Sequence, residues 1–526
     1  MVKIISFVSL LQSIPDNVFI IAACNPHRGN SLAMSEATVS TPENWFKPDY
    51  HVQKLHPTLR HLIWDYGALS KEQEKEYITA KLKFYTSAEL PETNVNALSD
   101  LVSLSQKILR QYASQHMENV LKLSPMEAKL CAKSCVSQRD IQRVFIFYSW
   151  IMKIYKKYDP HKEDENQCVR RAILVALGLV YYMRLNVKYR RSYKQFLDKI
   201  EKLGEYDISF SKAFDDEINW FTKQLILPNC IAETVALKEN MFATIACTMT
   251  RTPLIIVGNP GTSKTLSFNI VTANLKGKES KVELFRDKDI FMSLDPHFYQ
   301  CSRRTTSTEI EKVFSRAIVR QSYLAKVPLP VYSVVFMDEA GLPKQRMDSL
   351  KALHYHLDEQ SVSFIAISND VLDAAKTNRA VSLFRPQASE KELQELALAS
   401  IGDEVPTKSK EVVEALASAY LRIQNSNISD FGCLFGLRDF IFFVTYLRRK
   451  TKDAGRLLSL QIIVNGLERN FNGMEFKHFQ QLCTTFMRHV SCQVYWLPLS
   501  YLYGLCSACH QQLRSIPLTI EIPCPY

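Results

Sequence analysis

The sequence has little glycine, no long apolar run, and no linker rich in proline or glycine. Only 15 of its 526 residues are Gly, well below the usual share of about 7%, which argues against a β-rich protein with many tight turns and favours helices. The longest clean apolar run, Ala172 to Met183, lies between two arginines and is too short to cross a bilayer. We therefore expect a buried helix there and no transmembrane segment.

Paired cysteines are also scarce. The count of 13 Cys is odd and most stand singly in apolar runs, which is typical of reduced thiols in a cytosolic protein. Cys506, Cys509 and His510 have a metal-like spacing, but no second pair follows at zinc-finger distance. The first eleven residues resemble a signal peptide only weakly, and a chain that begins within a domain fits them better.

Charge is mixed along the chain, without long blocks of one sign. Lys and Arg number 65 against 54 Asp and Glu, a net charge of +11, and 46% of residues are apolar, as in ordinary globular proteins. The most basic aromatic stretch, Lys188 to Lys194, is interpreted as one face of a helix. We therefore expect no nucleic-acid partner.

Short apolar stretches alternate with segments of helical periodicity. This alternation predicts a parallel α/β core with appended helical parts. The predicted strands are 18–23, 254–257, 331–337, 364–367 and 381–384, and the predicted helices include 125–158, 170–185, 193–203, 234–250 and 391–400. A weak internal repeat pairs Phe19–Asn25 with Phe364–Asn369, and Ser137–Ile141 with Gly436–Phe440.

The strongest motif joins a predicted strand to a helix through a phosphate-binding loop. It consists of Gly258, Asn259, Pro260, Gly261, Thr262, Ser263, Lys264 and Thr265. Such a loop turns backbone N–H groups toward an anion at a helix N-terminus. Lys264 supplies a positive charge for the β- and γ-phosphates of ATP, and the Thr265 hydroxyl is suited to ligate Mg²⁺. Ser263 stands where the general pattern has glycine, so an altered loop geometry is one reading.

Two more strand ends carry polar groups that fit the same site. Asp338 and Glu339 end the strand predicted at 331–337, and Asn369 follows the strand at 364–367. Parallel strands deliver their carboxyl ends to one edge of a sheet. Asp338 is expected to hold Mg²⁺ through water, Glu339 to orient the attacking water, and Asn369 to contact the γ-phosphate or that water.

This order of motifs resembles the AAA+ ATPases, with their Walker A, Walker B and sensor 1 elements. Several stretches further resemble the mysterin family of giant AAA+ RING ubiquitin ligases. They are Gly258–Thr265, Tyr299–Ser302, Asp338–Leu342, Asn378–Arg379, Phe435–Asp439, Arg469–Phe471, Ala22–Pro26 and Trp64–Gly67. The resemblance covers roughly residues 15 to 490. It implies that Arg438 is a sensor 2 arginine, and that Arg379, or second Arg385, acts in trans on a neighbouring module.

The resemblance also implies an organisation for the chain: a fragment of a tandem ring of AAA+ modules. Residues 1–230 would end one module, 231–390 would form a nucleotide-binding core, 391–475 its helical lid, and 476–526 a linker or divergent tail. The expected function is ATP hydrolysis that drives changes in neighbouring modules, with ubiquitin machinery reached through domains absent here. The alternatives are a non-hydrolysing scaffold or another dynein- or midasin-type ATPase. The family further implies a cytosolic protein that associates with lipid droplets.

The same resemblance leads us to expect little turnover by the chain alone, because the arginine that acts on the site at Lys264 would come from another module.

Overall fold

The structure is a computed structural model, and it divides into two units, residues 1–135 and 136–526. It describes residues 70–86, 92–118, 136–158, 160–201, 209–228, 231–326, 330–343, 349–372, 374–385, 387–402, 406–425, 436–454, 458–473 and 475–493. The predicted strand at 18–23 lies outside these residues. In the first unit, helices α2 (Lys71–Thr86) and α3 (Glu92–Glu118) pack together. Arg110 of α3 holds the buried Glu74 of α2 through two hydrogen bonds.

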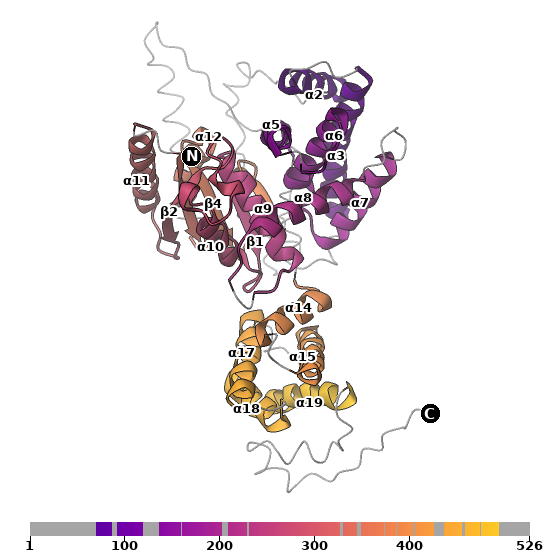
Figure 1. Cartoon of the computed structure of the whole chain (residues 1–526), viewed down its shortest axis with the longest axis vertical. Coiled ribbons are helices and arrows are strands. Elements are labelled where there is room, and N and C mark those ends of the chain that lie inside the picture. The colour runs from indigo at the N-terminus through magenta and orange to yellow at the C-terminus, as the bar shows by residue number, and fades with distance from the viewer. Residues whose placement is uncertain are drawn as a thin grey trace, which may run out of the picture. The chain divides into compact units, whose positions relative to one another are not determined.

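The second unit is built on a five-stranded parallel sheet (Figure 1) with strand order β2-β3-β4-β1-β5. The strands are β1 (Leu254–Gly258), β2 (Ser293–Gln300), β3 (Val331–Asp338), β4 (Ser363–Ser368) and β5 (Val381–Arg385). Four of them confirm the predicted strands. The central strands β1 and β4 are buried throughout, because helices cover both faces of a parallel sheet.

Strand β2 was not predicted from the sequence. It contains Asp295, Pro296 and His297, and its residues are mostly half-buried or exposed. The sheet order leaves β2 at one edge, which is where a strand tolerates proline. An edge strand lacks the continuous apolar run that marks a buried parallel strand, and this explains the omission.

The helices that precede or alternate with the strands in the chain are α9 (Val235–Met249), α10 (Lys264–Asn274), α11 (Ser307–Lys326), α12 (Ala352–Glu359) and α13 (Ala374–Thr377). Thr234 caps α9 by accepting a hydrogen bond from the Leu237 N–H. Twelve of the fifteen residues of α9 are buried, so this helix is a core element between the sheet and the helices that precede it in the chain.

Those preceding helices are α5 (Gln138–Tyr158), α6 (Glu165–Leu177), α7 (Val187–Glu201) and α8 (Phe210–Gln224). The predicted helix 170–185 does not run straight: a π-helical turn, η4 (Gly178–Tyr182), follows α6, and α7 begins at Val187. Gly178 permits close packing, because a Cβ there would lie 2.1 Å from the Phe214 ring of α8.

The last described part is a helical domain, which we call the lid. It contains α14 (Glu390–Ile401), α15 (Thr407–Asn425), α17 (Leu437–Ala454), α18 (Leu460–Phe471) and α19 (Phe476–Gln493). One apolar cluster joins all five helices, and Phe479, Leu482 and Phe486 of α19 belong to it. Helix α19 thus packs with the lid although it lies beyond residue 475, where we expected the lid to end. The domain boundaries themselves stay predictions.

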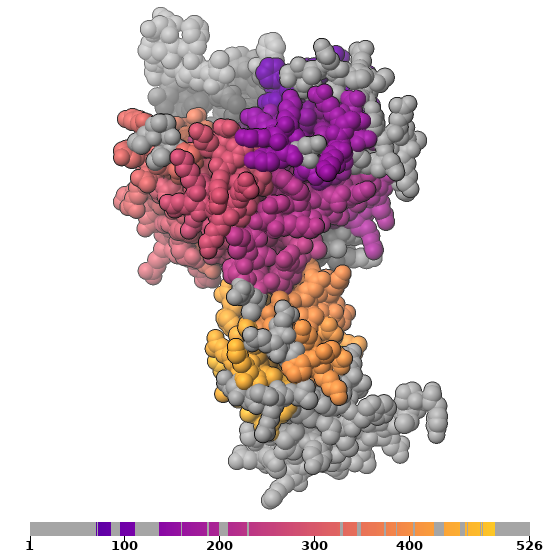
Figure 2. All heavy atoms as spheres, viewed as in Figure 1, coloured from indigo at the N-terminus to yellow at the C-terminus, as the bar shows by residue number. Residues whose placement is uncertain are grey.

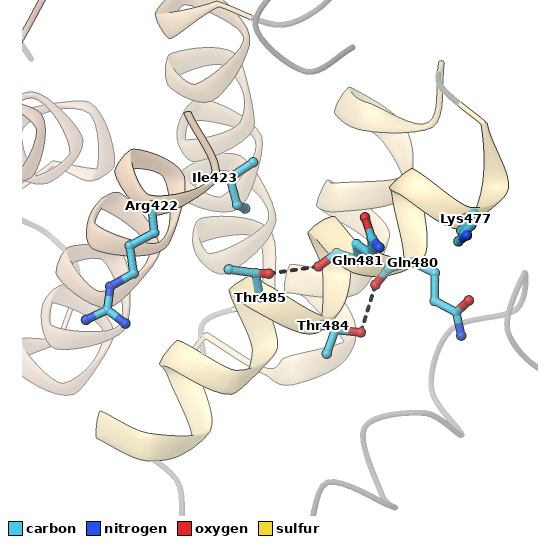
Figure 3. A pocket seen from close by; sticks show the side chains of 7 residues that line it. All are labelled: Arg422, Ile423, Lys477, Gln480, Gln481, Thr484 and Thr485. Atoms are coloured by element: carbon cyan, nitrogen blue, oxygen red, sulfur yellow. Dashed lines mark hydrogen bonds between the residues drawn. The ribbon is translucent and has the colours of Figure 1, made fainter. Parts of the chain in front are cut away.

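A pocket of about 470 Å³ opens in the lid. Figure 3 shows Arg422 and Ile423 of α15 facing α19, whose Lys477, Gln480, Gln481, Thr484 and Thr485 complete the lining. Both threonine hydroxyls donate to carbonyls of their own helix. The pocket contains none of the residues of the phosphate loop. No helix among the described residues is both long and apolar enough to cross a membrane.

Candidate nucleotide-binding site

The phosphate loop occupies the turn between the end of β1 and the start of α10. Gly261 has a φ of 90°, and Ser263, the residue before α10, adopts the left-handed conformation with φ 56° and ψ 23°. Ser263 therefore takes the conformation that glycine favours, at a cost of about 1–2 kcal/mol. Its side chain forms no capping hydrogen bond, so the first N–H groups of α10 are not capped by this serine.

Lys264 is the first residue of α10, and only 6% of it is exposed. Its Nζ donates to the carbonyl oxygens of Gly258 and Asn259, the latter at 2.8 Å, and to Asn369 Oδ1 at 3.2 Å. Burial lowers the pKa of Lys264 to about 8; the negative charge of Asp338 opposes this effect and the positive charge of Arg438 adds to it. The lysine thus joins the loop to the residue that follows β4.

The acidic end of β3 is held against β4 through a tight turn. Glu339 adopts a φ of 52°, and its N–H donates to Asp338 Oδ1 at 2.8 Å. The next N–H, from Ala340, donates to the Ile367 carbonyl of β4 at 2.8 Å. Since β3 and β4 are neighbours, Asp338 and Glu339 end at the same sheet edge as Asn369.

Two elements support the loop from outside. Asn240 of α9 donates from Nδ2 to the Thr262 carbonyl at 3.1 Å, and the Thr262 hydroxyl donates to the Asn259 carbonyl at 2.8 Å. On the lid side, a Cβ at Gly261 would lie 3.0 Å from the Leu437 Cβ, so the start of α17 packs directly on the loop. This contact brings the next residue, the exposed Arg438, to the site.

The structure therefore brings together most of the predicted site. The phosphate loop lies at the same sheet edge as Asp338, Glu339 and Asn369, and the lid helix α17 brings Arg438 to it. Thr265 is exposed in the first turn of α10. Sequence reasoning missed Asn240 and Leu437. Both belong to helices of other segments, and an Asn within an apolar helix or a Leu at a helix start carries no local pattern that marks a site.

The two candidate trans arginines lie differently. Arg379 donates to Asp358 Oδ2 at 2.8 Å and to the Ala375 carbonyl at 2.7 Å. Arg385, at the end of β5, is 3% exposed and forms an ion pair with the buried Glu239. A side chain committed in this way is not available to a neighbouring module, which leaves Arg379 as the candidate.

The donor set limits how a metal ion could be held. Across the described ranges, no group of three or more His, Cys, Asp or Glu side chains forms a metal cluster. Asp338 and Thr265 supply oxygen atoms only, which suits Mg²⁺, an ion that retains waters and takes most other ligands from phosphates. The residues present therefore fit Mg²⁺ carried with a nucleotide rather than an ion held by protein alone.

The residues around this site are similar to those of known proteins. Residues 230–392 match the family model described as the RNF213 AAA domain. The chain is 29% identical over 504 residues to the mouse E3 ubiquitin-protein ligase RNF213, which covers 87% of this chain and 9% of the mouse protein. It is also 27% identical over 574 residues to a Dictyostelium discoideum protein described as a putative uncharacterized transmembrane protein, covering 91% of this chain and 10% of that protein.

The chain thus spans about a tenth of the length of the curated relatives that it matches. Among solved structures, it is similar to the RuvB Holliday junction branch migration motor of Thermotoga maritima, with 12% identity and a TM-score of 0.29 over 53% of this chain and 83% of that one. A score this low carries no argument about function. The fold, a P-loop AAA+ sheet with appended helices, follows from the strand order and the family match.

Proposed function

We propose, from the match of residues 230–392 to the RNF213 AAA domain, that the chain binds ATP with Mg²⁺ and hydrolyses it. The observation that carries the proposal is the contact of Lys264 with Asn369 across a loop whose Gly261 and Ser263 have positive φ. It joins the phosphate loop to the end of the neighbouring strand, where a γ-phosphate would be contacted.

Each residue of the site has a distinct proposed task. The N–H groups of the loop and of the first turn of α10 bind the phosphates, and Lys264 transfers its contacts from loop carbonyls to phosphate oxygens. Thr265 and Asp338 would hold Mg²⁺, which would neutralise phosphate charge. Glu339 orients the attacking water as a general base, Asn369 positions it, and Arg438 stabilises the charge of the γ-phosphate.

In the longer protein, we propose that this module changes the position of its lid and passes that change to neighbouring modules. The lid contact supports this proposal, because Leu437 packs on Gly261 within the loop itself. Ubiquitin machinery would be reached through other parts of such a protein, and the cytosol is the proposed location. A non-hydrolysing scaffold is the second candidate. It is favoured because, among the contacts described at Lys264, no arginine other than Arg438 is present to stabilise the transition state.

The decisive test is calorimetric titration of Mg·ATP into the wild type and Lys264→Ala. Removing a buried charge that pairs with phosphate should weaken binding about 100-fold, a few kcal/mol. Lys278→Ala is the control, because Lys278 is an exposed lysine on the turn that follows α10. Equal affinity of the folded wild type and Lys264→Ala would reject the site. Glu339→Gln then separates the candidates: hydrolysis requires that it retain binding and lose turnover, whereas a scaffold shows no turnover in either form.

A further inference from the structure

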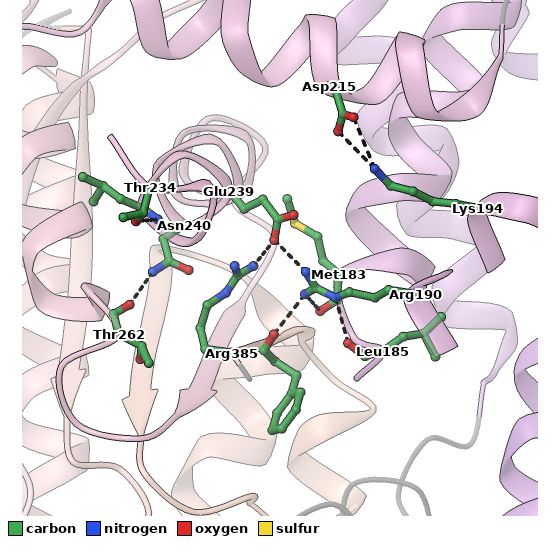
Figure 4. Close-up of polar contacts among 12 residues, drawn as sticks. Met183, Leu185, Arg190, Lys194, Asp215, Thr234, Glu239, Asn240, Thr262 and Arg385 are labelled. Atoms are coloured by element: carbon green, nitrogen blue, oxygen red, sulfur yellow. Dashed lines mark hydrogen bonds and ion pairs between the residues drawn. The ribbon is translucent and has the colours of Figure 1, made fainter. Parts of the chain in front are cut away.

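A buried ion network connects the nucleotide-binding sheet to the helices that precede it. Glu239 of α9 accepts hydrogen bonds on one carboxylate oxygen from Arg385 of β5 and from Arg190 of α7, the latter at 2.9 Å (Figure 4). All three residues are at least 92% buried. Burial favours the protonated acid, but the two arginines lower the pKa of Glu239 to about 2. The network therefore holds two positive charges and one negative charge.

Arg190 also fastens the outer edge of β5. It donates to the carbonyls of Met183 and Phe384, both at 2.9 Å, and to the carbonyl of Leu185 at 2.8 Å. In return, the Phe384 N–H donates to the Met183 carbonyl at 3.0 Å. Residues 183–185, which link η4 to α7, thus occupy the edge of β5 that no strand of the sheet covers.

From β5, the contacts lead directly to the phosphate loop. On its other side β5 pairs with β1, and Arg385 lies opposite Gly258, the first residue of the loop. The fit is close, since a Cβ on Gly258 would lie 2.5 Å from the Arg385 Cβ. A second route runs along α9, where Asn240, next to Glu239, donates to the Thr262 carbonyl. Asn240 Oδ1 is buried without a hydrogen-bond partner, so this side chain has one bond that fixes it.

We propose that Arg190 is a positioning residue for the phosphate loop, and that residues 183–190 are coupled to nucleotide binding through Glu239, Arg385 and Asn240. The inference rests on the proposed function for its nucleotide. It makes a segment upstream of residue 230 a working part of the ATP site. Because coupling between two sites is reciprocal, ATP would also order residues 183–190.

Arg190→Gln is the most informative variant. It leaves Glu239 and Arg385 as a neutral pair, whereas replacing Glu239 would leave two buried cations without a partner. The matched control is Arg191→Gln, at the next residue of the same helix, where the arginine is exposed. A second variant, Asn240→Ala, removes the bond to Thr262 and leaves the ion network in place.

The first measurement is amide hydrogen exchange of the full chain without nucleotide. Arg190→Gln should speed exchange several-fold in residues 258–263, and leave β3 and α18 at wild-type rates, while Arg191→Gln should leave the rates of residues 258–263 unchanged. A general loss of stability would instead raise exchange in all of these elements. Unchanged exchange in residues 258–263 of a folded Arg190→Gln would overturn the proposal. Should Arg190→Gln not fold, Arg190→Lys, which can keep the Glu239 pair but not all three carbonyl contacts, takes its place.

The second measurement adds Mg·ATP. We expect ATP to slow exchange of residues 183–190 in the wild type, and Arg190→Gln to weaken ATP binding on the order of tenfold. Asn240→Ala should bind ATP with a reduced effect on residues 183–190. Wild-type affinity in Arg190→Gln would contradict the coupling. Failure of the proposed function differs from failure of this inference. If the proposed function is wrong, the wild type does not bind ATP, and the nucleotide-free exchange still decides the role of Arg190.

Discussion

At the scale of residues, the phosphate loop is the part of the site that the sequence predicts best. Its pattern is local, so Lys264 and Thr265 could be placed without knowledge of the fold. The conformation of Ser263 could not, because nothing in the sequence states whether a serine there will adopt a positive φ. The same limit applies to Asn240, whose bond to Thr262 depends on how α9 packs against the loop.

The buried Lys264 predicts a pH dependence of ATP binding. Its pKa of about 8 lies below the ordinary value of 10.5, so between these values the folded chain holds fewer protons than the unfolded chain, and this lysine's cost to stability diminishes as the pH rises through that window. Phosphate binding requires the charged form. Affinity for Mg·ATP should therefore be constant below pH 8 and fall above it, with proton uptake on binding.

Calorimetry in buffers of different ionisation enthalpy measures that uptake directly. Lys264→Arg provides the comparison, because a guanidinium stays charged over the whole range. Binding that is independent of pH between 7 and 10 in the wild type would show that Lys264 does not titrate in this window.

At the scale of elements, prediction succeeded where burial was continuous and failed where the chain changes its geometry. The strands β1, β3, β4 and β5 are short apolar runs between segments of helical periodicity, and that alternation identifies them. The edge strand β2 has no such run. The π-helical turn after α6 also has no local signal, because its residues are as apolar as those of the helix before it. The Phe214 ring of α8 approaches Gly178 closely at the start of this turn, a tertiary contact that no local pattern marks.

This approach predicts that Gly178→Ala destabilises the chain. The added methyl group would lie 2.1 Å from the Phe214 ring, and overpacking of this kind costs about 1–3 kcal/mol. Chemical denaturation should show a lower unfolding midpoint. Gly436→Ala is the control, since its Cβ would meet nothing closer than 4.0 Å. Equal stability of the two variants would mean that η4 shifts freely.

At the scale of the whole chain, the internal repeat stays a prediction: Phe19–Asn25 lies outside the described residues, and only Ser137–Ile141 and Gly436–Phe440 can be compared. Asp140 accepts a hydrogen bond from the Ser137 N–H at 2.8 Å at the start of α5, and Asp439 accepts one from the Gly436 N–H at 2.8 Å at the start of α17. The arginine before each aspartate differs in its surroundings. The positive charge of Arg438 lowers the pKa of Lys264, while Arg139 shares Asp358 with Arg379.

The position of Arg379, away from the site at Lys264, predicts slow ATP turnover by the chain alone. Arg379 pairs with Asp358 rather than with the residues around Lys264, and an arginine supplied by a neighbour accelerates phosphoryl transfer by about 10³–10⁵-fold. Phosphate release at saturating ATP should therefore be slow for the purified monomer and rise when neighbouring modules are supplied. Turnover near 1 s⁻¹ by the monomer would contradict this expectation.

The segment that covers β5 also bears on how the protein avoids self-association. A bare strand edge offers unpaired N–H and C=O groups to any other chain and is a common start of aggregation. Here the Phe384 N–H and carbonyl are both bonded to the residues around Met183 and Arg190. A shorter fragment beginning at residue 230 would retain every residue of the phosphate loop and still expose this edge, so we expect it to associate with itself more readily than the longer chain.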